Sequence, residues 1–130
     1  MTQMNSLHVD IATELAQCAK DKTVISYGEL CQRVGYPSAR TIGRELEKIS
    51  LLTYEKCGVF LSVLVVNKDT INRPIPMPGN GFFSMYYAIS NNNIDRKQAV
   101  QQQRTRAYQQ SWTDLPDIIR NKIKLESISA

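Results

Sequence analysis

Three basic side chains recur at every fourth position within one short segment. Arg40, Arg44 and Lys48 are each four residues apart, a spacing that places them along one face of a helix. Guanidinium and ammonium groups arranged in this way can contact successive phosphates of a nucleic acid, and arginine can also pair with the edges of bases. Two glutamates in the same segment reduce its positive potential, so a solvated helix face is the competing interpretation. The helices predicted around the segment favour nucleic-acid binding.

A pair of short helices is predicted to hold this basic face. In Ser26-Tyr-Gly-Glu29 a hydroxyl precedes a carboxylate by three residues, which is typical of a helix N-terminus, so a helix is expected over 27–34. Pro37 disfavours helical geometry at the residue before it, and Ser38 can then cap a second helix over 39–49. Two short helices joined by a tight turn, the second of them basic, are typical of a helix-turn-helix. The apolar stripe of the second helix consists of Ala39, Ile42, Gly43, Leu46 and Ile49.

The segments on either side predict a small antiparallel sheet packed against helices. Apolar residues at steps of three and four indicate an amphipathic helix over 4–20. The runs Leu51–Tyr54 and Val59–Val66 are rich in apolar, β-branched and aromatic residues and are separated near Gly58, so we expect them to form the two strands of a wing. The second run is nearly all apolar and is therefore predicted to be buried at the centre of the fold.

The C-terminal half predicts a constrained loop followed by helices. Residues 67–81 hold three prolines at alternate positions, so they should form an extended loop, either functional or a packed connector. Helices are expected over 82–89 and 95–112, and a final helix after Asp114 with Pro116 in its first turn. We therefore predict one domain of mixed α/β (α+β) class over 1–130. It comprises a winged helix-turn-helix core with a small antiparallel sheet over 1–66, the loop over 67–81 and a helical part over 82–130.

Composition favours a small globular protein of the cytoplasm. Of the 130 residues 42% are hydrophobic and 22% are charged, values typical of a domain that buries a core. No segment approaches the roughly 20 apolar residues that span a bilayer, and the first residues do not form a signal peptide, so no membrane partner is expected. The three cysteines are 13 and 26 residues apart, which fits neither a disulfide framework nor a zinc site. The net charge of +4 arises mainly in residues 94–130, which carry seven basic and four acidic groups, and it permits a polyanionic partner.

No arrangement of residues predicts catalysis, a cofactor or a metal site. His8 is the only histidine and lies near the N-terminus, so neither a catalytic triad nor a histidine-based metal site is expected. The glycines at 79 and 81 follow prolines and not a strand, which argues against a phosphate-binding loop. An enzyme that uses only carboxylates and Lys68 is a weaker interpretation. We therefore expect no enzyme, no cofactor and no metal.

The run from Ile25 to Leu46 resembles a known helix-turn-helix. Its sequence is Ile-Ser-Tyr-Gly-Glu-Leu-Cys-Gln-Arg-Val-Gly-Tyr-Pro-Ser-Ala-Arg-Thr-Ile-Gly-Arg-Glu-Leu, and it is similar to that of the alkylguanine-DNA alkyltransferases and their alkyltransferase-like relatives. In that family a Ser-Tyr-Gly-Glu-Leu-Ala helix start is followed by a Pro-x-Ala-Arg-Ala-Val-Gly recognition helix. The resemblance covers about 22 of the 130 residues. It implies that Arg40 matches the family's arginine finger, which enters the minor groove and fills the gap left by a flipped nucleotide, and that Ser38 and Thr41 lie where phosphates are contacted.

The sequence departs from that family after the predicted strand. The alkyltransferases continue with Pro-Cys-His-Arg, whose thiol accepts the alkyl group, whereas here Asn67, Lys68 and Asp69 follow the strand. Alkyl transfer of that kind needs a thiolate beside the base, so this chain is not expected to perform it. The residues from Lys68 onward do not follow the family's pattern either, including the proline-rich loop and the long C-terminal helix.

These observations predict a non-catalytic DNA-binding protein with double-stranded DNA as its partner. The alternative is a protein-binding module, for example a subunit or inhibitor of a nucleic-acid-processing or defence complex encoded by a phage or mobile element. The predicted DNA-binding residues are Ser38, Arg40, Thr41, Arg44, Lys48, Lys68 and Arg73.

Overall fold

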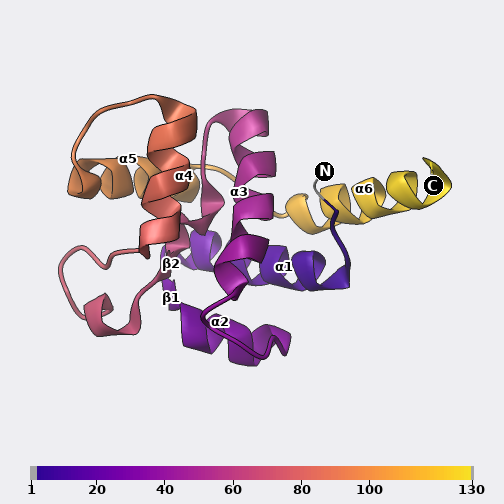
Figure 1. Ribbon diagram of the computed structural model, residues 1–130, viewed down its shortest axis with the longest axis horizontal. Helices are drawn as coiled ribbons and strands as arrows, with labels where there is room; N and C mark the ends of the chain where they lie inside the picture. The colour runs from indigo at the N-terminus through magenta and orange to yellow at the C-terminus, as the bar shows by residue number, and fades with distance from the viewer. Residues whose placement is uncertain (1–2, 130) are drawn as a thin grey trace.

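The computed structural model describes residues 3–129 and shows six α-helices around a very short parallel sheet (Figure 1). The mixed α/β class is thus confirmed in its coarse form, although helix dominates. In chain order the elements are α1 (Ser6–Asp21), β1 (Ile25–Ser26), α2 (Tyr27–Val34), α3 (Ile42–Cys57), the 3-10 helix η1 (Leu61–Leu64), β2 (Val65–Val66), the 3-10 turn η2 (Lys68–Thr70), α4 (Asn80–Ser90), α5 (Arg96–Gln109) and α6 (Leu115–Ser129).

The first two helices begin where side chains satisfy their free backbone N–H groups. Asn5 caps α1 by accepting a hydrogen bond from Leu7 N, and His8 Nδ1 accepts one in return from Asn5 N at 2.9 Å. Ser26 Oγ caps α2 by accepting from Glu29 N at 3.1 Å. Both helices were expected from the sequence, α2 with the same bounds.

The third helix corrects two expectations. It begins at Ile42 and not at Ala39, and no side chain caps it. It then continues through Leu51–Tyr54, which were expected to be a strand, and stops where Gly58 adopts a left-handed conformation with φ of 74°. The helix continues because its buried positions keep the three-to-four spacing beyond residue 49, and that pattern outweighs local strand preference. The buried positions are Ile42, Leu46, Ile49, Ser50 and Thr53.

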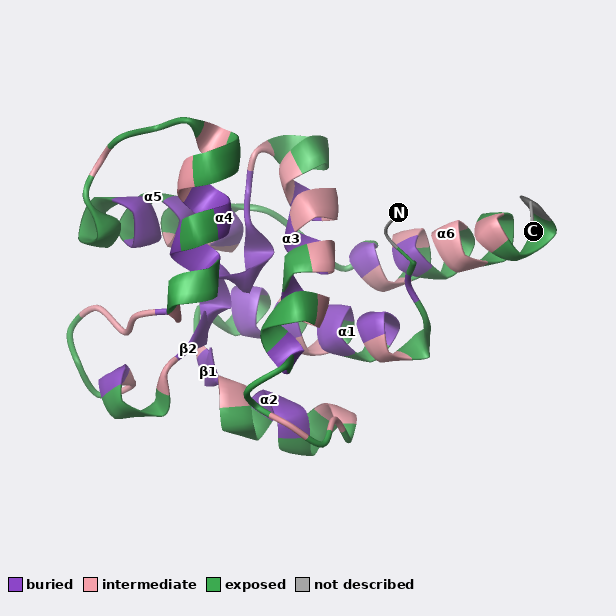
Figure 2. Cartoon of the chain, in the orientation of Figure 1, coloured by how far each residue is buried: buried purple, intermediate pink, exposed green. Residues whose placement is uncertain are grey.

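The predicted antiparallel sheet and wing are wrong. Only Val65–Val66 form a strand within the apolar run 59–66, and they pair in parallel with Ile25–Ser26 of β1. The rest of the run is mainly the 3-10 helix η1. The expectation that this run lies at the centre of the fold is confirmed, since all eight residues are buried (Figure 2). The backbone N–H and C=O groups of a buried segment need hydrogen-bond partners, and the two-residue strand β1 supplies few of them here.

Two hydroxyls of α3 supply several of these partners. Thr53 Oγ1 donates to Val59 O at 2.7 Å and lies 3.3 Å from Leu61 N, which donates to it. Ser50 Oγ accepts from Ser62 N at 2.9 Å and donates to Ser62 Oγ at 2.6 Å. The inner face of α3 is therefore fixed in register against the buried segment by polar as well as apolar contacts.

Two side chains of α5 supply further hydrogen-bond partners for the backbone of the buried segment. Gln103 Oε1 accepts from Phe60 N at 2.7 Å, and its amide nitrogen donates to Gly58 O at 3.4 Å. Arg104 Nη2 donates to Val63 O and to Pro76 O, both at 2.9 Å, so it links the buried segment to the proline-rich loop. Burial lowers the pKa of Arg104, yet carbonyl oxygens are strong acceptors for its donors.

The proline-rich loop is folded onto itself. Asn67 N donates to Met77 O at 2.9 Å, and Thr70 Oγ1 accepts from Met77 N at 3.0 Å while donating to Asn67 O at 2.8 Å. These bonds close the loop at its base, so its last residues enter α4 at a fixed position. The loop was expected, and its closure makes it a connector that positions α4.

The C-terminal helices enclose the core from the other side. Phe82 and Tyr86 of α4 are buried beside Phe60, whose ring meets both edge to face. Helix α5 ends three residues earlier than expected, and Trp112 is buried in the link after it, where its Nε1 donates to Ala107 O at 2.8 Å. Helix α6 packs along α1, and its far end projects from the body of the protein (Figures 1 and 2).

Within residues 3–129 no helix is both long and apolar enough to cross a membrane.

Replacing Gln103 by methionine should destabilise the fold strongly. The variant keeps the length of the side chain but leaves the buried Phe60 N and the half-buried Gly58 O without their partner. We expect the free energy of unfolding to fall by about 2–4 kcal/mol in urea denaturation. Gln101→Met, at an exposed position of the same helix, is the control and should change it by less than about 0.5 kcal/mol. Equal stability of the two variants would contradict this role for Gln103.

Candidate nucleic-acid interface

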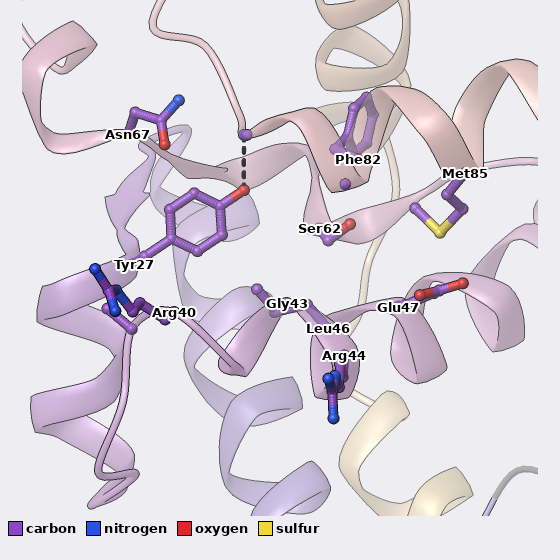
Figure 3. A pocket seen from close by; sticks show the side chains of 13 residues that line it. Tyr27, Arg40, Gly43, Arg44, Leu46, Glu47, Ser62, Asn67, Phe82 and Met85 are labelled. Atoms are coloured by element: carbon purple, nitrogen blue, oxygen red, sulfur yellow. Dashed lines mark hydrogen bonds between the residues drawn. The ribbon is translucent and has the colours of Figure 1, made fainter.

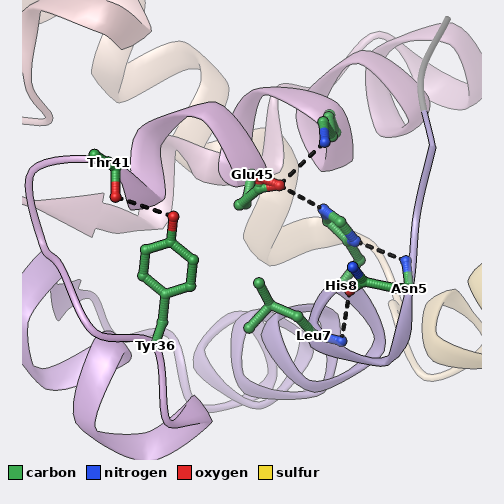
Figure 4. Close-up of polar contacts among 7 residues, drawn as sticks. Asn5, Leu7, His8, Tyr36, Thr41 and Glu45 are labelled. Atoms are coloured by element: carbon green, nitrogen blue, oxygen red, sulfur yellow. Dashed lines mark hydrogen bonds and ion pairs between the residues drawn. The ribbon is translucent and has the colours of Figure 1, made fainter.

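The residues before α3 form a turn and not the first turn of a helix. Thr41 N and Ile42 N both donate to Ser38 O at 3.2 Å, and Thr41 Oγ1 lies 3.0 Å from Tyr36 Oη (Figure 4). The Ser38 side chain was expected to cap the helix, but it does not. Instead, the backbone carbonyl of Ser38 accepts the two hydrogen bonds that close the turn. Arg40 therefore lies at the exposed tip of a turn that leads directly into α3.

A pocket of about 380 Å³ opens beside this turn, between α3, the start of α2 and the start of α4 (Figure 3). Arg40 and Arg44 lie on its α3 side, and both are exposed. Neither of these arginines has an ion pair among the interactions described for residues 3–129. Glu47 also lines the pocket, so the charged lining is two arginines against one carboxylate, a net +1. The rim therefore favours an anionic group.

The opposite wall carries hydrogen-bonding groups. Tyr27 Oη accepts from Gly79 N at 2.8 Å, which leaves its own hydrogen available as a donor. Burial raises the pKa of Tyr27 although the Gly79 bond opposes this, so the phenol stays protonated at neutral pH. The side-chain nitrogen of Asn67 donates to Pro78 O at 3.4 Å, and its oxygen is left to accept. The wall thus offers one donor and one acceptor.

Gly79 permits this close approach. A Cβ atom at position 79 would lie 3.3 Å from Tyr27 Oη and 3.7 Å from Asn67 Oδ1. A side chain there would press on the two groups that form the polar wall.

The remaining walls are apolar. Leu46 comes from the inner face of α3, and Phe82 and Met85 come from successive turns of α4; all three are buried and border the pocket (Figure 3). A cavity with apolar walls, a few directed polar groups and a charged rim is suited to a flat heterocycle that carries an anion.

Lys48 does not extend the basic rim. Its Nζ lies 3.1 Å from Glu45 Oε1, and the same carboxylate lies 3.3 Å from Nε2 of the fully buried His8 of α1 (Figure 4). Burial would raise the pKa of Glu45, but the bond to Lys48 and the proximity of His8 lower it overall. The predicted stripe of three cations is therefore reduced to Arg40 and Arg44. Lys48 instead pairs with Glu45, the carboxylate of α3 that also contacts His8 of α1.

The other predicted binding residues do not line the pocket. Ser38 and Thr41 are in the turn beside Arg40, whereas Lys68 and Arg73 are exposed on the proline-rich loop. Ala39, expected on the apolar stripe, is exposed at the pocket edge. Of the predicted set, the fold brings only Arg40 and Arg44 together on the pocket.

Sequence reasoning did not select the residues of the other walls. Tyr27 stood inside the helix-start motif, Asn67 directly after the predicted strand, and Phe82 and Met85 in the helix expected over 82–89, to which no binding role was assigned. One signal was present for Asn67, since it follows the strand where the alkyltransferases carry their thiol motif. Nothing local indicated that four distant segments would meet there.

Comparisons of the chain with protein-family models, with curated proteins and with solved structures gave no match.

The contact between His8 and Glu45 should make stability depend on pH. His8 Nδ1 accepts from Asn5 N, so the neutral ring carries its proton on Nε2, which faces Glu45 without being aligned as a hydrogen bond. Burial, more than the opposing attraction of Glu45, lowers the pKa of His8 from its ordinary 6.5, and Lys48 lowers it further. As the pH falls below about 6.5, His8 is therefore protonated in the unfolded chain before it is protonated in the folded one. The folded protein loses stability over the interval from that pH down to the lowered pKa of His8 in the folded state.

His8→Gln should remove this pH dependence. Glutamine at the same position can accept from Asn5 N and donate toward Glu45, but it does not titrate. Urea unfolding at pH 7.5, 6.5 and 5.5 should show a falling midpoint for the wild type and a flatter profile for the variant. His8 is the only histidine, so no other side chain of its type changes charge in this interval. An unchanged slope in the variant would show that His8 is not responsible.

Proposed function

We propose that this chain is a non-catalytic DNA-binding protein that contacts a duplex with the turn 38–41 and the start of α3. The observation that carries the proposal is the pairing of Arg40 and Arg44, exposed and without described ion pairs, with an adjacent pocket of about 380 Å³. The arginines would contact phosphates and a groove, and the pocket would receive a nucleobase turned out of the duplex.

The dimensions and chemistry of the pocket support this use. Its volume lies toward the lower end of the range of small-ligand sites, about 300–1,000 Å³. Phe82 and Met85 provide apolar surface for a ring, while the hydroxyl of Tyr27 and the oxygen of Asn67 offer one donor and one acceptor. The Watson–Crick edge of every nucleobase presents donors and acceptors side by side, so such a wall fits a base better than a purely apolar ligand.

The resemblance to the alkyltransferases supports the same proposal. It assigns to Arg40 the position of the finger that replaces a flipped nucleotide, and Arg40 lies at the tip of a turn on the rim of the pocket. Asn67 follows β2 where that family carries its thiol motif, and an amide accepts a hydrogen bond but does not accept an alkyl group. These two features support binding without alkyl transfer.

Arg40→Ala should weaken duplex binding by about 1–3 kcal/mol if the side chain enters a groove. Fluorescence anisotropy with a labelled duplex in 50–200 mM salt measures this loss, and the wild type should lose affinity steeply as salt rises. Arg120→Ala is the control, because it removes one arginine from α6, where that side chain pairs with Asp117. Unchanged affinity of Arg40→Ala would remove Arg40 from the interface, and absent wild-type binding would reject DNA as the partner.

Filling the pocket should abolish base extrusion without unfolding the protein. Gly81 lies in the first turn of α4 at the pocket wall, and a Cβ there would meet no atom within 4 Å. Gly81→Leu should therefore occupy the pocket while preserving the helix. A duplex with a central 2-aminopurine should brighten on adding the wild type, because the base leaves the stack, and should not brighten with the variant.

Gly28→Leu provides the matched control for that experiment. Gly28 is also an exposed helical glycine with no atom within 4 Å of its Cβ position, and it does not line the pocket. This control should keep the 2-aminopurine response. Brightening by Gly81→Leu equal to that by the wild type would show that no base enters the pocket.

A protein-binding module is the second candidate, and one observation favours it. The projecting end of α6 exposes Leu125 and Ile128, with 64% and 74% of their surface accessible. Large apolar side chains exposed on the same helix end are a feature of protein contacts. This candidate becomes the first if the wild type does not bind duplex DNA.

A further inference from the structure

Helix α5 presents an outer face that contains no carboxylate. We define this α5 outer face as the exposed residues Lys97, Gln98, Gln101, Gln102, Thr105, Arg106 and Gln109. Arg96 is exposed as well, but its guanidinium lies over the Phe83 ring and donates to Asn80 Oδ1, so it is not counted in this face. At 100° per residue these positions span half of the helix surface, with Lys97 and Arg106 at its two edges and the amide and hydroxyl side chains between them, and the buried residues cover the other half. From residue 96 through residue 113 the chain has four basic residues and no acidic one.

This composition sets α5 apart from the other charged helices. Helices α1, α2, α3 and α6 each combine basic residues with carboxylates, for example Glu29 with Arg33 in α2 and Asp117 with Arg120 in α6. Opposite charges one turn apart are the usual support of a solvated helix. No ion pair described within residues 3–129 involves α5, so no carboxylate is described as an ion-pair partner of Lys97 or Arg106.

The inner side of α5 holds the outer face rigid. Gln103 and Arg104 bond to backbone groups of residues 58–63 and of the proline-rich loop, and Tyr108 Oη donates to Thr23 O at 3.0 Å. Asp95 and Gln98 also form a capping box at the start of the helix. A helix fixed in this way presents its outer side chains without first having to become ordered, which reduces the cost of binding.

The chemistry of the face selects the kind of partner. A protein-docking face needs apolar anchors, and the groove of about 580 Å³ along the α5 outer face contains only one, the half-buried Ile94. Amide and hydroxyl groups can donate to phosphate oxygens, cations attract them, and the absence of carboxylates removes repulsion. These features fit a polyanionic backbone and not an apolar partner.

We infer that the α5 outer face is a second nucleic-acid contact surface, which binds the phosphate backbone through Lys97 and Arg106 with the glutamines between them. None of its residues lines the pocket beside α3, so it is a separate region of the molecule. With 14 residues α5 is about 21 Å long, enough to follow several phosphates of one strand. This inference rests on the proposed DNA-binding function and extends it to a second region.

The double variant Lys97→Gln/Arg106→Gln tests the surface. It removes two charges, retains polar side chains that favour helix, and leaves the pocket and the α3 arginines untouched. In anisotropy titrations with a labelled duplex of 30 base pairs, we expect about tenfold weaker binding or more near 0.1 M salt. The slope of log affinity against log salt concentration should become shallower by about 1.8, as for the loss of two phosphate contacts.

A matched variant controls for net charge. Lys122→Gln/Lys124→Gln also removes two positive charges, but from α6, and the affinity of this variant for the duplex should stay within about twofold of that of the wild type. An equal loss in this control, or wild-type affinity and slope in the α5 variant, overturns the inference. The isosteric Gln102→Glu gives an independent reading, since one carboxylate placed on the face should weaken binding several-fold without changing the shape of the helix.

The outcomes separate this inference from the proposed function. If the wild type binds duplex DNA, and Arg40→Ala lowers the affinity while the α5 variant does not, the α5 surface is rejected and the α3 interface stands. If the wild type does not bind duplex DNA at all, both are rejected together.

Discussion

The fully buried segment at residues 59–63, which follows the half-buried Gly58, is the constraint on which the rest of the fold depends. Its backbone groups lie away from water and outside the sheet. Val63 N donates to Phe60 O within the segment, but most of the other groups need a partner from elsewhere. Side chains supply these partners: Ser50 and Thr53 from α3, and Gln103 and Arg104 from α5. Two helices far apart in the sequence are thereby held at fixed positions on either side of one strip of backbone.

The same constraint builds the candidate interface. Helix α3 fixes its inner face against the buried segment, and this leaves Arg44 on its outer face and Arg40 at the turn before it. Arg104 joins Val63 to the proline-rich loop, and the base of that loop leads directly to Gly79 and the start of α4. The pocket walls are therefore extensions of the core. Helix α5, which secures the segment with its inner side, is for the same reason a stable carrier of the basic and amide groups on its outer side.

Part of the candidate site could be predicted, and the limit lies in how far each residue's partners are from it along the chain. Arg40 and Arg44 were accessible to sequence reasoning because a spacing of four residues places them on neighbouring turns. Lys48 fits the same spacing, but its partner Glu45 is held by His8, which is 37 positions earlier, and no local pattern shows that pairing. Tyr27 and Asn67 face one pocket because β1 and β2 pair, so neither could be assigned a role from its own neighbours.

The sequence by itself determined the local features: the cap at Ser26, the bounds of α2, the proline-rich loop and the burial of 59–66. Each depends on interactions within a few residues or on apolar content alone. Tertiary structure decided that Leu51–Tyr54 continue α3, that only Val65–Val66 form a strand, and that this strand is parallel to β1. An apolar segment is compatible with a strand or a 3-10 turn when it is enclosed on all sides. The choice was made by the side chains that reach its backbone, and these come from helices before and after it.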